Sequence, residues 1–222
     1  ARRAGSSRCT RHTSAPSAAL NHASAAGPAG GPIDGGTGND ILVGDNAANT
    51  LNGNAGNDII FAGGGDDNIN QTSNQGRDII DGGAGSDTYT LNGVQGAELF
   101  RIYAVTAGQN AGLAASLNTT FLASTEIVIT RTVNGTESVI AELDNIEEIS
   151  VNTLNVTNNN NNGGPDGGAS GGDTIQVIGN FDTTSLNYST ITIEGSAGND
   201  VVDISSLSSA HRIVFRSNGG QD

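Results

Sequence analysis

The sequence has no lysine, methionine or tryptophan, and its single cysteine is Cys9. One cysteine excludes a disulfide framework. Aromatic residues make up 4% of the chain, which excludes a large aromatic core. No stretch reaches the roughly 20 apolar residues that a membrane-spanning helix needs. The formal net charge of −14 at pH 7 argues against nucleic acid and anionic membrane surfaces as partners.

Glycine is abundant instead, with 33 residues, and much of it recurs with a period of nine residues. The nonapeptide GGTGNDILV (Gly35–Val43) is followed by five more, at 44–52, 53–61, 62–70, 73–81 and 82–90. The sixth place holds Asp40, Asn49, Asp58, Asp67, Asp78 and Asp87. The eighth place holds Leu42, Leu51, Ile60, Ile69, Ile80 and Tyr89. A fixed short period of this kind predicts a coil in which each repeat stacks on its neighbours.

The composition of the repeat explains how it folds. Glycine tolerates positive φ, so the first part of each repeat can turn sharply without steric clash. The last three places form a short strand whose middle side chain points inward. Two repeats then make one full turn of the coil. Gln71 and Thr72 are two extra residues that break the period, and we expect them to form a bulge.

The sixth-place side chains of successive coils are expected to stack along the two edges. Repeats two apart share an edge, which pairs Asp40 with Asp58, Asp58 with Asp78, and Asp67 with Asp87. Calcium takes about 6–8 oxygen ligands at about 2.3–2.6 Å from carboxylates and carbonyls, whereas magnesium prefers a tighter octahedron. The sequence therefore predicts Ca²⁺ along both edges. Asn49 offers a neutral oxygen and is expected to weaken its edge.

The stretch Gly35–Thr90 resembles the RTX, or hemolysin-type, calcium-binding nonapeptide repeat G-G-x-G-x-D-x-U-x. This resemblance implies a parallel β-roll within a secreted bacterial protein, reached by type I export. Ser196–Asp222 and Val139–Val151 are also similar to the C-terminal regions of RTX-bearing bacterial heme peroxidases of the animal type. No heme-ligand pattern accompanies that second resemblance.

After the repeats the sequence turns into ordinary strand patterns. An Asn-Gly pair between two alternating runs, at Val133-Asn134-Gly135-Thr136, predicts a β-hairpin. Further strands are expected at 99–105, 146–151, 174–179, 190–194 and 212–215, with one short helix within 106–117. The fold class is therefore all-β: a parallel β-roll followed by a β-rich sandwich- or solenoid-like region.

Two separate nonapeptides reappear in this later region, at Gly168–Gln176 and Gly195–Asp203. They put Asp173 and Asp200 at the sixth place as further candidate calcium ligands, and Asp222 ends a partial repeat. As isolated repeats they are expected to lack a neighbour on the same edge, which leaves their calcium binding open.

The chain is expected to divide into five parts. These are a disordered linker at 1–32, the calcium-binding roll at 33–92, a β-rich domain with the hairpin at 93–157, an Asn/Gly-rich linker at 158–167, and a β-rich segment at 168–222. The first thirty residues carry four arginines and no acid, unlike the rest. We expect the whole to be a piece of a longer protein.

Catalytic candidates are few. His211 could be drawn into a Ser/His/Asp site, but no nucleophile motif supports it, and a strand-end histidine is the simpler interpretation. Asp144, Glu147 and Glu148 suggest a carboxylate pair, yet a solvated edge explains them as well. We therefore expect this segment to have no enzymatic activity of its own.

The outward places of the roll differ between its two sheets. One sheet presents an apolar face that includes Ile41, Ile59, Phe61 and Ile79, which predicts docking to an upstream or downstream part of the same protein. The other presents threonine and asparagine. Three functions remain open: a calcium-binding module that folds and stabilises a secreted protein, the non-catalytic tail of an RTX enzyme such as a peroxidase, and an adhesin-type surface module.

Overall fold

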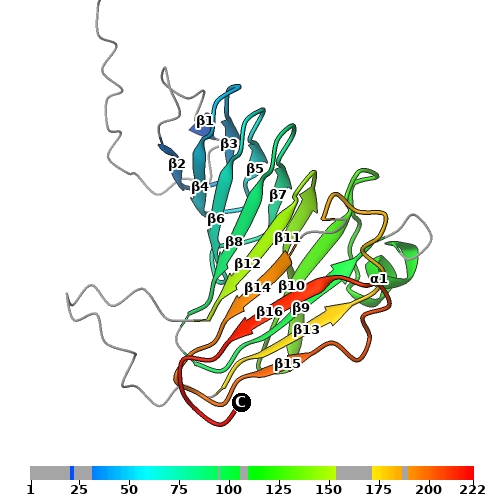
Figure 1. Cartoon of the computed structure of the whole chain (residues 1–222). Helices are drawn as coiled ribbons and strands as arrows, with labels where there is room; N and C mark the ends of the chain where they lie inside the picture. The colour runs from blue at the N-terminus through cyan, green and yellow to red at the C-terminus, as the bar shows by residue number, and fades with distance from the viewer. Residues whose placement is uncertain (1–20, 23–31, 95, 106–109, 154–171, 187–189) are drawn as a thin grey trace, which may run out of the picture.

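The computed structural model describes residues 21–22, 32–94, 96–105, 110–153, 172–186 and 190–222. Two β-sheets run side by side along one long axis, with the N-terminal strands at one end and β15 and β16 at the other (Figure 1). One cluster of buried apolar side chains runs from Ile33 to Ile193. The chain winds between the sheets as a solenoid.

The nine-stranded sheet forms one side of the solenoid. In spatial order it contains β1 (Asn21–His22), β3 (Asp40–Val43), β5 (Ile59–Phe61), β7 (Asp78–Asp81), β11 (Thr136–Asp144), β10 (Ile127–Val133), β9 (Leu99–Ala104), β13 (Thr174–Ile178) and β15 (Val201–Asp203).

The seven-stranded sheet forms the other side of the solenoid, and all its neighbouring strands pair in parallel. In spatial order it contains β16 (Arg212–Arg216), β14 (Thr190–Glu194), β12 (Glu148–Asn152), β8 (Thr88–Asn92), β6 (Asn68–Thr72), β4 (Thr50–Ala55) and β2 (Pro32–Thr37). The single helix of the described residues is α1 (Asn110–Ser116).

The nonapeptides form the predicted parallel β-roll. Leu42 pairs in register with Ile60, and Ile60 with Ile80, so identical places of alternate repeats lie side by side. All six eighth-place side chains are at most 1% exposed. Burial of these side chains, at about 1.5–3 kcal/mol each, is the main apolar contribution to the stability of the coil.

Gln71 and Thr72 do not form the bulge that the sequence suggested. They lengthen β6 by two residues, and they pair in register with Leu91 and Asn92 of β8. A two-residue insertion preserves the alternation of a strand, because side chains alternate with a period of two. Gln71 therefore points inward, where its amide donates to the Ile140 carbonyl (2.9 Å) and accepts from the Tyr89 hydroxyl (2.6 Å).

The later β-rich region continues the solenoid, so the sandwich alternative is wrong. β9, β13 and β15 extend one sheet, and β12, β14 and β16 extend the other. Both sheets thus run through the predicted boundary at residues 92 and 93. The predicted strands all form, with ends shifted by at most one or two residues, and the short helix forms within the predicted range 106–117. The predicted linkers at 1–32 and 158–167 lie outside the described residues, apart from 21–22 and Pro32.

The predicted hairpin is β10–β11, and its place in the sheet was not foreseen. Asn134 and Gly135 both have positive φ, 51° and 77°, as a tight hairpin turn of this kind requires. The hairpin is inserted between β7 and β9: β11 pairs with β7 in parallel, and β10 pairs with β9 antiparallel. It therefore interrupts the stack of coils in one sheet only.

Candidate metal-binding edges

The turns of the solenoid form two edges. The turns that lead from the seven-stranded sheet into the nine-stranded sheet form what we call the first edge. The turns that lead from the nine-stranded sheet back to the seven-stranded sheet form the second edge. Asp40, Asp58 and Asp78 lie on the first edge, because each begins or immediately precedes a strand of the nine-stranded sheet. Asn49, Asp67 and Asp87 lie on the second edge.

Hydrogen bonds show that the residues expected to share ions are neighbours on the same edge. The backbone N–H of Asp40 donates to Asp58 Oδ1 (2.8 Å), and that of Asp58 donates to Asp78 Oδ1 (2.9 Å). On the second edge the N–H of Asp67 donates to Asp87 Oδ1 (2.8 Å). Each carboxylate thus reaches the backbone of the preceding coil, and the acids stack in a ladder.

Several carboxylate oxygens of this ladder have no hydrogen-bond partner although they are buried. They are both oxygens of Asp40 and the Oδ2 atoms of Asp58, Asp67 and Asp87. These four side chains are at most 1% exposed. A buried carboxylate oxygen without a donor is costly unless a cation faces it.

In four of the six repeats the first place is a glycine, which leaves room for the sixth-place side chain: Gly35, Gly44, Gly53 and Gly82. A Cβ placed on Gly53 would lie 2.3 Å from Asp58 Oδ2, and one placed on Gly35 would lie 3.0 Å from Asp40 Oδ2 and 2.7 Å from the Gly53 carbonyl oxygen. Carboxylate and carbonyl oxygens therefore converge above a backbone that carries no side chain.

Burial raises the pKa values of these acids. It raises the pKa of Asp78 to about 7 and that of Asp87 to about 6, with the neighbouring Asp58 and Asp67 charges adding to the effect. The pKa values of Asp40, Asp58 and Asp67 are raised for the same reason. Without a cation, the charged form of the ladder is therefore disfavoured in the folded chain.

The donor set fits calcium. Within the described residues no three Asp, Glu, His or Cys side chains are arranged so that they could hold a metal ion by themselves. Each edge instead offers one sixth-place side chain for every two repeats, a carboxylate at all places but Asn49, together with backbone carbonyls, and oxygen ligands of this mixed kind are those of Ca²⁺. The unpartnered oxygens of Asp40, Asp58, Asp67 and Asp87 are the ones that would hold it.

Asn49 lies in the ladder, as its place in the repeat predicts. Its N–H donates to Asp67 Oδ1 (2.6 Å), and its Oδ1 accepts from the Asp45 N–H (2.9 Å). Its amide nitrogen donates to Asp45 Oδ1 (3.3 Å). The Asn49 side chain is thus satisfied by the protein, unlike those of Asp40, Asp58, Asp67 and Asp87.

Asp173 and Asp200 are not isolated, contrary to the expectation from the sequence. The N–H of Asp173 donates to Asp200 Oδ1 (2.8 Å), and that of Asp200 donates to Asp222 Oδ1 (2.7 Å). The solenoid brings these repeats onto the first edge although 27 residues separate the first pair. Burial raises the pKa of Asp173 to about 7.

Two acids that the sequence interpretation missed complete the ladders. The N–H of Glu98 donates to Asp173 Oδ1 (2.6 Å), and Glu147 Oε2 accepts from the N–H of Asp87 (2.8 Å). The signal for Glu98 was present, because GVQGAELFR (93–101) fits the nonapeptide with glutamate at the sixth place. Glu147 belongs to a group that was interpreted as a solvated edge, and it lies in the second edge instead.

His211 lies directly before β16, at the strand end that its sequence position predicts. Its Nδ1 lies 3.0 Å from Ser209 Oγ, two residues away, and its ring packs on Phe181 with centroids 5.5 Å apart. Ser209 Oγ also accepts from the Phe181 N–H (3.0 Å). These contacts hold a strand-end turn.

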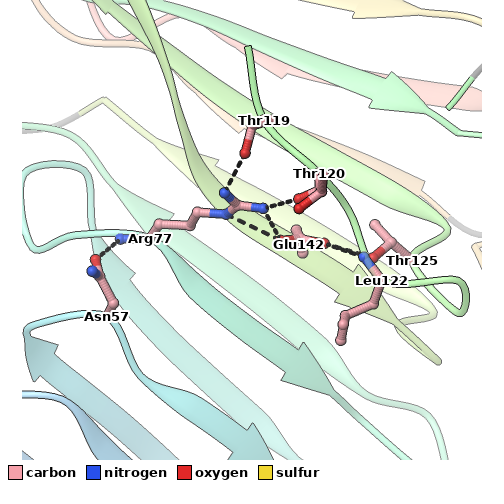
Figure 2. Close-up of polar contacts among 7 residues, drawn as sticks. All are labelled: Asn57, Arg77, Thr119, Thr120, Leu122, Thr125 and Glu142. Carbon is pink, nitrogen blue, oxygen red and sulfur yellow. Dashed lines mark hydrogen bonds and ion pairs between the residues drawn. The ribbon is translucent and has the colours of Figure 1, made fainter. Parts of the chain in front are cut away.

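An ion pair next to the first edge holds the hairpin to the roll (Figure 2). Arg77, which precedes Asp78, donates through Nε (3.0 Å) and Nη2 to Glu142 Oε1 on β11. Its guanidinium also donates to Thr119 Oγ1 and the Thr120 carbonyl, each at 2.6 Å. The Glu142 side chain, 2% exposed, accepts through Oε2 from the Leu122 N–H (3.0 Å) and Thr125 Oγ1 (2.8 Å).

Comparison with known proteins agrees with this geometry. The family model of the RTX calcium-binding nonapeptide repeat matches the chain in four copies, over residues 34–69, 72–93 and 192–203. The chain therefore carries RTX calcium-binding repeats, which are typical of secreted bacterial proteins. No curated protein and no solved structure matches it, so the resemblance to heme peroxidases receives no support. No helix among the described residues is long and apolar enough to cross a membrane.

Proposed function

We propose that this segment is a calcium-dependent folding and stabilising module of a secreted protein that is exported unfolded by a type I route. The observation that carries the proposal is the set of unpartnered oxygens on four buried carboxylates, stacked along the two edges. Calcium bound there neutralises the ladder and supplies the contacts that these oxygens lack.

The chain's own residues make folding conditional on the ion. The buried eighth-place side chains favour the coil, whereas stacked carboxylates with raised pKa values oppose it. A ligand that binds only the folded state stabilises that state by mass action. Scarce calcium inside the cell therefore keeps the roll unfolded, and abundant calcium outside folds it.

Hydrogen exchange at two calcium concentrations tests this switch. At about 0.1 µM calcium we expect the amides of 33–92 to exchange as in an unfolded chain, and at about 1 mM, the range of extracellular calcium modules, we expect protection of β3 to β8. Magnesium at the same concentration is the control. Protection of β3 to β8 at both calcium concentrations would overturn the proposal.

In this proposal the segment has no catalysis of its own and docks to another part of the protein through its apolar face. Val43 and Phe61 of this face are 42% and 45% exposed, while Ile79 lines a 350 Å³ cavity together with Phe121 and Leu122. Ile59→Lys is expected to leave calcium affinity unchanged and to loosen docking. Unchanged protease resistance at the junction in the full-length protein counts against the docking.

The seven-stranded sheet favours a second candidate, an adhesive surface. Its outward row consists of small polar side chains in register: Asn52, Asn70, Thr90, Ser150 and Thr192. A regular polar ladder of this length suits a repetitive partner such as a glycan or ice. Thermal hysteresis or retention on a glycan array, lost in Thr90→Lys, tests it.

A further inference from the structure

The first edge is interrupted where the hairpin enters the nine-stranded sheet. Its ladder runs through Asp40, Asp58 and Asp78 on one side of β10–β11, and through Glu98, Asp173, Asp200 and Asp222 on the other. Asp78 and Glu98 are thus the last and first acids that flank the inserted hairpin.

Glu98 occupies the structural position of a sixth-place aspartate. A Cβ on Gly93 would lie 2.8 Å from Glu98 Oε2, just as one on Gly82 would lie 2.8 Å from Asp87 Oδ2. Its N–H also donates to the acid of the neighbouring coil, as those of Asp40 and Asp58 do. Only the length of the side chain differs.

The carboxylate of Glu98 is nevertheless fully bonded by the protein. Oε1 accepts from Ser73 Oγ (2.7 Å) and from Arg131 Nε (2.5 Å), and Oε2 accepts from the Val94 N–H (2.7 Å). The Glu98 side chain is 2% exposed and that of Arg131 is 18% exposed. Asp40, Asp58, Asp67 and Asp87, by contrast, each keep an oxygen without a donor.

We propose that the Arg131 guanidinium takes, at Glu98, the place that a calcium ion takes at Asp40, Asp58, Asp67 and Asp87, so that this turn folds without metal and binds none. The proposal rests on the calcium-binding function proposed above. Arg131 reaches the edge because β10 belongs to the inserted hairpin. A guanidinium presents a rigid fork of donors to a carboxylate, keeps its charge, and repels a second cation from the same oxygens.

The first edge then has two sources of positive charge. On the Asp40–Asp78 side the charge comes from solution, and at the hairpin it comes from the chain. Gly93, Val94 and Glu98 are then expected to stay ordered in chelator.

Counting bound calcium by native mass spectrometry tests the proposal with two variants. Arg131→Gln removes the internal cation and is expected to bind one calcium ion more than the unmodified chain. Glu98→Gln is expected to bind the same number, because no ion is lost from a site that Arg131 fills. Arg101→Gln is the matched control: Arg101 pairs with Glu137 and touches no acid of either ladder.

The outcomes separate this inference from the function on which it rests. A fall by one ion in Glu98→Gln would overturn the inference even if Arg131→Gln did not fold. An unchanged count in folded Arg131→Gln would overturn it as well. If the unmodified chain bound no calcium, the proposed function would fail first, and the inference with it.

Discussion

At the sixth place of the repeat, a single carboxylate is expected to stabilise the fold when calcium is bound and to destabilise it when calcium is absent. Asp58 Oδ1 accepts from the Asp40 N–H (2.8 Å), while Oδ2 has no partner. Asp58→Asn keeps the first contact and removes the charge. We expect calcium affinity to fall by about tenfold or more, equivalent to about 1.4 kcal/mol, and stability in chelator to rise, because an uncompensated buried charge is gone.

Calorimetric titration and thermal unfolding in chelator measure the two effects. Asp182→Asn is the control, since Asp182 is an exposed acid that is hydrogen-bonded to no acid of either ladder. A stability change of the same sign with and without calcium would contradict a metal role for Asp58.

Tyr89 shows how the two-residue insertion is accommodated in the core. Its ring is fully buried and its hydroxyl donates to Gln71 Oε1. Tyr89→Phe leaves that amide oxygen without its donor and is expected to cost about 1–3 kcal/mol of unfolding free energy. Urea unfolding at saturating calcium measures it. In Gln71→Leu the same tyrosine substitution is expected to cost less, and an equal cost in both backgrounds would show that the contact has no energetic role.

Single positions show why the sixth-place acids could be predicted from the sequence only in part. Asp40 to Asp87 follow the nine-residue period apart from the two-residue insertion at Gln71 and Thr72, so their edges and neighbours could be deduced from the period. Glu98 departs from the aspartate pattern, and its neighbour Asp173 lies 75 residues away. No local pattern contains that contact, because it depends on where the hairpin enters the sheet.

At the scale of elements, the hairpin is held to the roll by an ion pair whose carboxylate, on Glu142, is 2% exposed and whose guanidinium side chain, Arg77, is 31% exposed. Arg77→Ala leaves this buried carboxylate without its cation. Removing one partner of a fully buried pair costs about 3–5 kcal/mol. Because Arg77 is partly exposed, we expect Arg77→Ala to lower the unfolding free energy by about 3 kcal/mol, the lower end of that range, and to open the 119–125 segment to protease.

The matched control is Arg216→Ala. Arg216 also pairs with a glutamate, Glu194, but its side chain is 59% exposed. Exposed pairs contribute about 0–1 kcal/mol. Equal losses in the two variants would show that burial of Glu142 does not set the strength of the clamp.

Elements with a local signal were predictable, and their assembly was not. The Asn134-Gly135 turn and the alternating runs beside it specify a hairpin in any context. Its pairing with β7 and β9 depends on sheet edges made by segments far away in sequence. The bulge expected at Gln71 was wrong because the partner strand β8 carries an equal extension, Leu91–Asn92, that restores the register.

For the whole molecule, the stacked acids predict opposite pH dependences with and without calcium. A raised pKa in the folded state means stability that is present at low pH and lost as pH rises through that pKa. In chelator we therefore expect stability to fall from about pH 4, the ordinary pKa of an aspartate in the unfolded chain, to about pH 7, through the folded-state values of about 6 for Asp87 and about 7 for Asp78 and Asp173.

With calcium present the sign reverses, because the ion binds the deprotonated acids. Calcium affinity is expected to rise over the same pH range. Thermal unfolding measured across this range, with chelator in one series and saturating calcium in the other, checks both slopes. Two parallel curves would mean that these acids are not linked to the metal.

The central claim is that calcium completes the fold of the roll, and far-UV circular dichroism during a calcium titration tests it most directly. We expect a gain of β signal that calcium produces and magnesium at the same concentration does not. A β spectrum already complete in chelator would contradict the account, because the strands would then hold the coil without the ion.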